Sequence, residues 1–303
     1  MQIDERSAAF YRNLPGSLGD RLRQVMAEED SQTVMTITDG RCPMWQADGL
    51  CRIQRELGEE ALCKTCREFP RLTHDYGDFV EMGLELSCPE AARILFNTPN
   101  PSYVIVDAPG GDNPDYDTDA MAILLQTREA VRDLLSDSSR PANEVLALLL
   151  MYGYHAQAIL DGEEDSAFDP VAALVEARQF AAAGSIGAIL TLYKGLEILS
   201  PDWPRRLDTP SQAPWSPVHQ TLARYFVDRY WLQAVADYDL ISRVKLAVIS
   251  CILIRALGGD VVQTAQQYSK EIENSIDNLE AILDAAYQSQ AFADNHLLGA
   301  LLL

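Results

Sequence analysis

The hydrophobic pattern along the chain changes near residue 118. From there to residue 303, apolar positions recur every three to four residues, the spacing of amphipathic and buried helices. The proline-rich stretch 200–217 interrupts this pattern and is predicted to be an irregular connection. The predicted helices cover residues 118–136, 142–162, 170–199, 214–236, 239–258 and 260–288, and a short apolar helix ends the chain.

Residues 1–117 show a mixed pattern. Residues 1–30 have helical spacing, which a Pro-Gly pair at 15–16 interrupts. Residues 34–38 and 79–86 have the composition and alternation of strands. We expect these two strands to pair as a short β-hairpin.

A connection rich in Pro, Gly and Asn, residues 97–117, separates the two patterns. Just before it, Ser87-Cys88-Pro89-Glu90 has the residue types of a helix start. We therefore predict two domains: residues 1–100 form a small cysteine-cluster module with a short β-hairpin, and residues 101–303 form an all-helical domain. The predicted fold class is mainly α.

Composition narrows the classes of function. Hydrophobic residues make up 48% and charged residues 23% of the chain, as in soluble globular proteins. The 24 Lys and Arg against 45 Asp and Glu leave a formal charge of −21, which argues against nucleic acid or an anionic membrane as the partner. No secretory signal pattern opens the sequence, and no apolar run reaches the ~20 residues of a membrane span. We expect a cytoplasmic protein.

Five of the six cysteines lie in one short part of the chain. They are Cys42, Cys51, Cys63, Cys66 and Cys88. In a reducing compartment, clustered cysteines indicate metal ligands or catalytic groups more than disulfides. Four thiolates suit Zn²⁺ or the iron atoms of an iron–sulfur cluster, so we predict a metal site made from these five residues.

Two other interpretations of the cysteines stay open. The thiols could be scattered buried groups that pack as small hydrophobic side chains, or Cys63 and Cys66 could form a redox pair. Lys64, Arg67 and Arg71 add local positive charge, which would lower the pKa values of nearby thiols. The sixth cysteine, Cys251, lies in an apolar segment and is predicted to be a core residue.

Several motifs around the cysteines resemble the flagellin lysine-N-methylase family. They are Cys42-Pro43-Met44-Trp45, Gly49-Leu50-Cys51-Arg52-Ile53, Leu62-Cys63-Lys64-Thr65-Cys66, Phe69-Pro70-Arg71 and Leu84-Glu85-Leu86-Ser87-Cys88-Pro89-Glu90, with a looser likeness at Arg224-Tyr225-Phe226-Val227 and Arg243-Val244-Lys245-Leu246-Ala247. The family usually opens with a further cysteine-rich stretch, which this sequence does not contain.

The resemblance implies an enzyme that transfers methyl groups from S-adenosylmethionine to lysine side chains of flagellin. It also implies an iron–sulfur cluster held by the cysteine motifs, with zinc as the alternative metal. The alternative function is a metal-binding interaction module without catalysis of its own.

Lysine methylation needs a neutral amine, whereas the lysine side chain has a pKa of ~10.4. The pattern does not single out a catalytic base. The candidates to accept the proton are His74, Asp75, Tyr76, Glu81, Glu85 and, in an apolar helix, His155. Their plain structural alternatives are a solvated loop at 74–76, the wet face of a strand for Glu81 and Glu85, and a core or interface position for His155.

One segment has the outline of a methyl-donor loop. Tyr103–Gly111 reads as a strand followed by a glycine-rich turn. The residues directly after it do not open a helix, and no alternation of strands and helices follows, as a doubly wound nucleotide fold would require. We predict that this segment is a linker.

Overall fold

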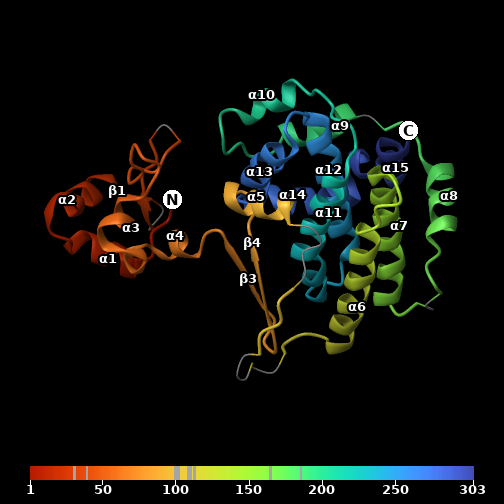
Figure 1. Cartoon of the computed structure of the whole chain (residues 1–303), viewed down its shortest axis with the longest axis horizontal. Helices are drawn as coiled ribbons and strands as arrows, with labels where there is room; N and C mark the ends of the chain where they lie inside the picture. Colours follow the sequence, from red (N-terminus) through yellow and green to blue (C-terminus); the bar gives the residue numbers. More distant parts are fainter. Residues whose placement is uncertain are drawn as a thin grey trace. The chain divides into compact units, whose positions relative to one another are not determined.

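The computed structural model describes residues 1–303 except 30–31, 39, 99–102, 108–110, 112–113, 164–165 and 185. The chain forms two compact units, Met1–Leu72 and Thr73–Leu303 (Figure 1). Helices dominate both, and the few strands form two-stranded sheets. The predicted mainly α fold is confirmed.

The first unit is built from short helices and one hairpin. Its elements are α1 (Glu5–Asn13), α2 (Gly16–Val25), β1 (Met26–Glu29), β2 (Gln32–Met35), α3 (Arg52–Leu57), the 3-10 turn η1 (Glu59–Ala61) and α4 (Lys64–Glu68). The predicted helix break at 15–16 is confirmed, and Gly16 adopts the positive φ of +81° that favours glycine.

The strand pairing differs from the prediction. β1, which was expected to continue a helix, pairs with β2 in antiparallel register, with Met26 opposite Met35. The predicted pairing of residues 34–38 with 79–86 is therefore wrong. A neighbouring strand competes better because a short turn costs less chain entropy than the closure of a loop of about forty residues.

Sulfur-containing side chains form part of the core of the first unit. Its buried members include Ile3, Ala8, Tyr11, Leu18, Leu22, Met35, Met44, Ile53, Leu62 and Cys63.

The Asp4 carboxylate connects the starts of α1 and α4 through two hydrogen bonds. One carboxylate oxygen accepts from the Ser7 amide at 3.0 Å as the cap of α1, and the other accepts from the Lys64 amide at 2.8 Å at the start of α4.

The second unit begins with a hairpin and continues with helices. Its elements are β3 (Arg71–Asp75), β4 (Val80–Leu84), α5 (Pro89–Asn97), α6 (Thr118–Leu135), α7 (Ala142–Leu160), α8 (Pro170–Phe180), α9 (Ile186–Lys194), α10 (Trp203–Asp208), α11 (Pro217–Tyr230), η2 (Trp231–Val235), α12 (Leu240–Leu257), α13 (Val261–Ile272), α14 (Ile276–Gln288), η3 (Gln290–Phe292) and α15 (Asp294–Leu302).

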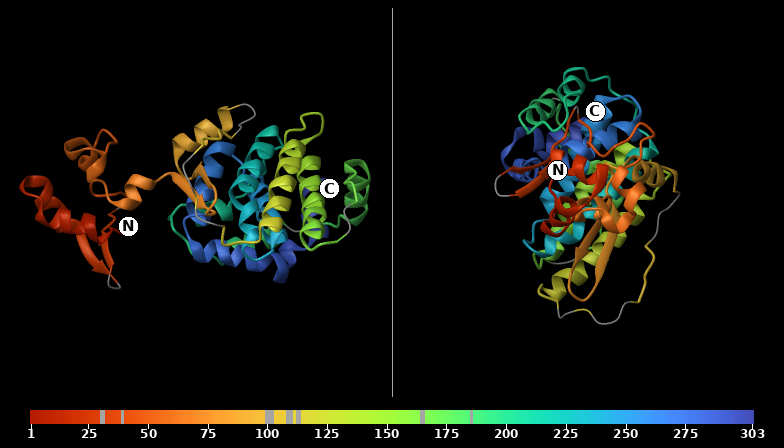
Figure 2. Two further views of the ribbon diagram at one scale, coloured as in Figure 1. Left: turned by 90° about the horizontal axis from the view of Figure 1, so that it is seen from below. Right: turned by 90° about the vertical axis from the view of Figure 1, so that its left-hand side faces the viewer.

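Helix α12 is the centre of the second unit. It packs against α7, α11 and α14, and Figure 2 shows α6, α7 and α11 side by side. Apolar residues occur all around α12, so a position surrounded by other helices is the one that removes them from water.

Among the described residues, no helix combines the length and apolar character that crossing a bilayer requires.

The division between the units lies near residue 72, not residue 100. Leu86 and Ala92, in the segment that follows β4, belong to the large core of the helical body. The Leu86 amide also donates to the Tyr225 hydroxyl at 3.2 Å. The β3–β4 hairpin and α5 are thus part of the second unit, because their apolar side chains are buried by its helices, and that unit is not all-helical.

Three of the ranges predicted from the apolar periodicity differ from the observed helices. The stretch 170–199 splits into α8 and α9, and 260–288 splits into α13 and α14. At the second break the Ser275 hydroxyl caps α14 and accepts from the Asn278 amide at 3.2 Å, which favours a new helix start over continuation. The stretch 200–217 contains the short helix α10, with Pro204 in its first turn.

Candidate functional site

Turns of the first unit bring Cys42 and Cys51 together. The Trp45 amide donates to the Cys42 carbonyl at 2.9 Å, and Trp45 pairs with Cys51 in an isolated bridge. Gly49, at a φ of +82°, allows the chain to reverse between them. Cys51 then stands at the N-terminal boundary of α3. Local turn chemistry therefore delivers two of the predicted ligands to one place.

Cys63 and Cys66 flank the first turn of α4. Cys63 is the residue before the helix and is 2% exposed, and its carbonyl accepts from the Arg67 amide at 3.0 Å. A hydrogen bond from the Cys66 thiol lowers the pKa of Cys63 to about 6, and the same contact raises the pKa of Cys66. The hydrogen bond between the two thiols thus favours the thiolate form of Cys63 and the thiol form of Cys66.

Positive side chains are not the main cause of this shift. Lys64 lies 3.9 Å from Glu68, and Arg71 donates to the Arg67 carbonyl at 2.9 Å. The largest causes that lower the pKa of Cys63 are hydrogen bonds from the side chain and backbone of Cys66. The predicted role of the neighbouring cations in activating the thiols is therefore not what this geometry produces.

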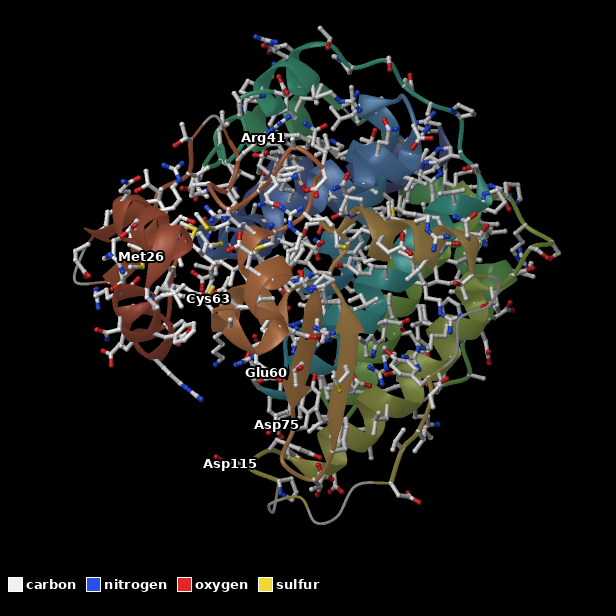
Figure 3. The ribbon with its side chains drawn as sticks, turned by 60° about the vertical axis from the view of Figure 1, so that its left-hand side comes forward. Met26, Arg41, Glu60, Cys63, Asp75 and Asp115 are labelled. Carbon is white, nitrogen blue, oxygen red and sulfur yellow. The ribbon has the colours of Figure 1, made fainter. Side chains whose placement is uncertain are left out.

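All four thiols of the first unit are electrostatic neighbours. Cys42 and Cys51 both contribute to the raised pKa of Cys66, after the larger effects of Cys63 and burial. Two thioethers adjoin the group: the Cys42 thiol donates to the Met35 sulfur at 3.7 Å, and Cys66 donates to Met1 at 3.7 Å. Cys63, which is labelled in Figure 3, shows where this group of thiols lies. We call Cys42, Cys51, Cys63 and Cys66 the thiol cluster.

The donor set of the thiol cluster is soft, as iron–sulfur clusters and zinc prefer. Among the residues that the structure describes, no three His, Cys, Asp or Glu side chains are arranged to hold a single ion. The donor type therefore fits zinc or an iron–sulfur cluster. The described side chains are not already arranged around a single ion. The four thiols are electrostatic neighbours, and their assignment as metal ligands stays a prediction beside the alternative of buried thiols that pack as small hydrophobic groups.

The remaining cysteines lie in the second unit. Cys88 is half-buried at the N-terminal boundary of α5, as the sequence predicted for this helix start. Its assignment to the same metal site stays a prediction. Cys251 is fully buried in α12, donates to the His219 carbonyl at 3.6 Å, and has a pKa raised by burial. Its predicted core role is confirmed.

The β3–β4 hairpin brings several predicted proton acceptors to the second unit. Glu81 receives two hydrogen bonds from the Arg128 guanidinium, at 2.9 and 2.5 Å. Arg128 is only 3% exposed, so this is a buried ion pair rather than the wet face of a strand. Sequence reasoning missed Arg128, although an arginine on the apolar side of a predicted helix is the signal that could have found it.

His74 is placed in β3, not in a solvated loop. Its Nε2 atom is buried and has no hydrogen-bond partner among the described residues. Burial lowers the pKa of His74, the nearby Arg229 charge lowers it further, and Glu81 acts in the opposite direction. Burial and the Arg229 charge thus both disfavour the protonated form of the His74 ring.

Glu85 lies in a second polar environment, next to the end of β4. The Ser87 hydroxyl donates to its carboxylate at 2.5 Å. Burial raises the pKa of Glu85 despite this hydrogen bond and the Arg229 charge, and Glu273 raises it further. Arg229 and Glu273 form a buried ion pair at 2.9 Å. The Arg229 charge thus acts on both His74 and Glu85.

The other predicted acceptors have structural contacts. Asp75 closes the hairpin turn, where its carboxylate accepts from the Gly77 amide at 2.9 Å. Tyr76 stacks on Phe79 with ring centroids 4.9 Å apart, and burial raises its pKa to about 12. His155 packs 5.5 Å from the ring of Phe168, in agreement with a core or interface role.

The segment considered as a methyl-donor loop is only partly described. Tyr103 lies over two guanidinium groups, 4.2 Å from Arg132 and 5.4 Å from Arg128. Residues 104–106 are extended and exposed, and residues 108–110 lie outside the described part. The next helix, α6, begins at Thr118, so no helix opens directly after the segment. These features agree with a linker.

Comparison with known proteins finds three similar sequences, all from Salmonella. Over 61 residues the chain is 44% identical to a "Flagellar biosynthetic protein FliU" of Salmonella muenchen and to proteins named "Lysine-N-methylase" of Salmonella typhimurium and Salmonella choleraesuis. The resemblance to lysine-N-methylases is confirmed over this segment. It covers 20% of this chain, 36% of the FliU protein and 15% of each lysine-N-methylase. No family model and no solved structure matches.

Proposed function

We propose that this chain is a protein lysine N-methyltransferase that acts on flagellin with S-adenosylmethionine as methyl donor. The similarity to proteins named lysine-N-methylase carries the proposal. The matched segment is short relative to those proteins, so the activity of the whole chain rests on the test below. The convergence of the thiol cluster supports a metal group as part of the same protein.

The reaction asks two things of the protein. The lysine amine must lose its proton, and its nitrogen lone pair must then attack the methyl carbon in line with the sulfonium sulfur. The new carbon–nitrogen bond forms as the carbon–sulfur bond breaks, and the sulfur keeps the electron pair. We assign His74 as the proton acceptor because its Nε2 is buried and unpartnered within the described residues.

Glu85 supports this role by its charge. Its carboxylate can hold an approaching lysine ammonium before the proton is lost, because a buried negative charge attracts a cation strongly. The Glu81 carboxylate is already paired with Arg128. Burial that raises the pKa of Glu85 also allows it to take the proton in place of His74. Positioning and proton removal are thereby assigned to one hairpin.

An iron–sulfur cluster would be held by Cys42, Cys51, Cys63 and Cys66. When bound, it would supply one-electron chemistry and tie the loops of the first unit together. The hydrogen bond from Cys66 already favours the thiolate of Cys63, and metal binding would displace the thiol protons of the ligands. Zinc is the alternative occupant.

The test is methyl transfer in vitro. The chain is purified without oxygen and incubated with flagellin and S-adenosylmethionine, and lysine peptides are examined for the mass of added methyl groups. We expect methylation, and we expect His74→Gln to lower kcat by about a hundredfold. The matched control is His296→Gln, a histidine in the first turn of α15 outside the candidate site, which retains activity. Absence of methylation with a metal-replete protein contradicts the proposal.

The alternative is a metal-binding interaction module without catalysis. The extent of the match, 15% of each lysine-N-methylase, favours keeping this second candidate. Metal and sulfide analysis separates the two: iron with sulfide supports the enzyme, and zinc alone without methyl transfer supports the module. Cys66→Ser should lose metal in either case, whereas Cys251→Ala, outside the thiol cluster, should retain it.

A further inference from the structure

The outer side of β4 carries an apolar stripe without a cover among the described residues of the second unit. Val80, Met82 and Leu84 are 52%, 66% and 42% exposed. They occupy alternate positions of the strand, so their side chains point to the same side. The intervening Glu81 points the other way, to Arg128. Exposed apolar groups that line up in this manner mark interaction sites more than scattered ones do.

A second exposed apolar run lies beside the hairpin. Val104, Ile105 and Val106 are 85%, 91% and 78% exposed. The run is anchored at the hairpin on both sides. Tyr103 and Glu81 contact the same guanidinium, that of Arg128. Further along, the Tyr116 hydroxyl donates to Asp78 at 2.6 Å. We call residues 80, 82 and 84 the hairpin surface, and residues 104–106 are a separate exposed run next to it.

The exposed charge at the turn end of the hairpin is acidic, because the nearby cations Arg128 and Arg132 are buried and paired with Glu81 and Asp228. Residues 73–127 contain ten Asp and Glu and a single Arg or Lys, Arg93. Four of the acids are exposed on the hairpin and the segment beside it: Asp75, Asp78, Asp107 and Asp115. Figure 3 shows Asp75 and Asp115 toward the same end of the hairpin. Arg93 is already paired with Glu90 at 2.5 Å.

We propose that the hairpin surface docks an extended, lysine-bearing segment of the protein substrate. The inference rests on the proposed function for the identity of that substrate. Alternate apolar side chains of the segment would pack on Val80, Met82 and Leu84, because the side-chain period of an extended chain matches that of β4. Its lysines would lie toward the acidic end of the hairpin. Docking of this kind raises the local concentration of substrate lysines at the turn end of the hairpin, next to the end of β3 that carries His74.

The test measures binding separately from methylation. The probe is purified flagellin, titrated without methyl donor. We expect Val80→Thr/Met82→Thr/Leu84→Thr to raise Kd about tenfold or more, because threonine keeps the strand but removes apolar contact. We also expect the wild-type Kd to rise with salt. The control is Val171→Thr/Ile276→Thr, at positions 62% and 71% exposed elsewhere on the second unit. That variant should bind as the wild type does.

Oxidation of Met82 shows whether flagellin, the first unit or a second copy of the chain covers the hairpin surface. Met82 should oxidise readily in the free chain and become protected by flagellin, whereas the buried Met44 and Met121 should stay protected throughout. Slow oxidation of Met82 in the free monomer would mean that the first unit covers the stripe. A wild-type dimer that becomes monomeric in the threonine variant would mean that a second copy covers it. Either result overturns the inference, as does wild-type affinity in the threonine variant or no binding of flagellin by the wild type.

Failure of this inference differs from failure of the proposed function. Methylation with an unchanged KM in the threonine variant would refute the docking surface and leave the enzyme intact. Binding that depends on the stripe, without methylation by the metal-replete chain, would support the docking surface and refute the enzyme.

Discussion

The two units of this chain solve the problem of stability by different means. The first has 72 residues, ten Lys and Arg against twelve Asp and Glu, and a small core into which thiols and thioethers pack. The second has 14 against 33 and a large apolar core around α12. Small domains bury too little apolar surface to be robust alone and commonly need a metal or disulfides. We therefore expect the first unit to depend on a metal at its thiol cluster, whereas the large apolar core stabilises the second unit.

The largest expected difference between the two units is their response to removal of bound metal. Oxidation followed by a chelator should unfold residues 1–72 and leave 73–303 folded, since metal-binding energy in small domains is folding energy, on the order of 10 kcal/mol. Hydrogen–deuterium exchange measures both units in one sample. Equal loss of protection in the two units, or none in the first, would contradict the assignment of a structural metal.

Loss of the buried ion pair should be the largest single-residue effect in the second unit. Arg128→Met leaves the Glu81 carboxylate buried without its cation and should cost about 3–5 kcal/mol in the free energy of unfolding. Chemical denaturation followed by circular dichroism measures it. The double variant Arg128→Met/Glu81→Leu should recover much of the loss, and Arg178→Ala, from a pair 54% and 20% exposed, should cost less than about 1 kcal/mol.

Asp4 should have a moderate, pH-dependent effect confined to the first unit. Backbone hydrogen bonds from Lys64 and Ser7 lower the pKa of Asp4 to about 2. Its carboxylate therefore stabilises the fold fully above about pH 4, the value of the unfolded group, and loses this effect as the pH falls toward 2. Asp4→Ala should cost about 1 kcal/mol at pH 7. The fluorescence of Trp45, which is alone among tryptophans in residues 1–72, follows unfolding.

The difference between wild type and Asp4→Ala should shrink between pH 4 and pH 2. A difference that stays constant over this range would show that the carboxylate charge has no part in capping α1 and α4.

The smallest effect should come from the surface of the first unit. Arg12 and Glu28 form an ion pair at 2.5 Å, but their side chains are 48% and 60% exposed. Water and salt screen such a pair, so Arg12→Ala should change the free energy of unfolding by less than about 1 kcal/mol. A loss as large as that of Arg128→Met would mean that burial does not govern the strength of these pairs.

Local signals made part of the site predictable. The spacing of Cys63 and Cys66 around one helical turn, and the Gly-containing reversal between Cys42 and Cys51, depend on neighbours in sequence. Arg128, Arg229 and Glu273 were not predicted as partners of the hairpin, because each lies far along the chain from the residue that it contacts. Periodicity likewise identified most helices but not the break at Ser275, where one side chain decides between continuation and a new start.

The sequence by itself determined the mainly helical fold, the density of cysteines, the excess of acid and the resemblance to lysine-N-methylases, because these depend on composition and on residues close together in the chain. Only the tertiary structure decided that β2 pairs with β1, that the β3–β4 hairpin joins the second unit, and that Glu81 is a buried partner of Arg128 rather than a solvated group. Burial and pairing depend on contacts between distant segments, and the free energy of those contacts exceeds local preference.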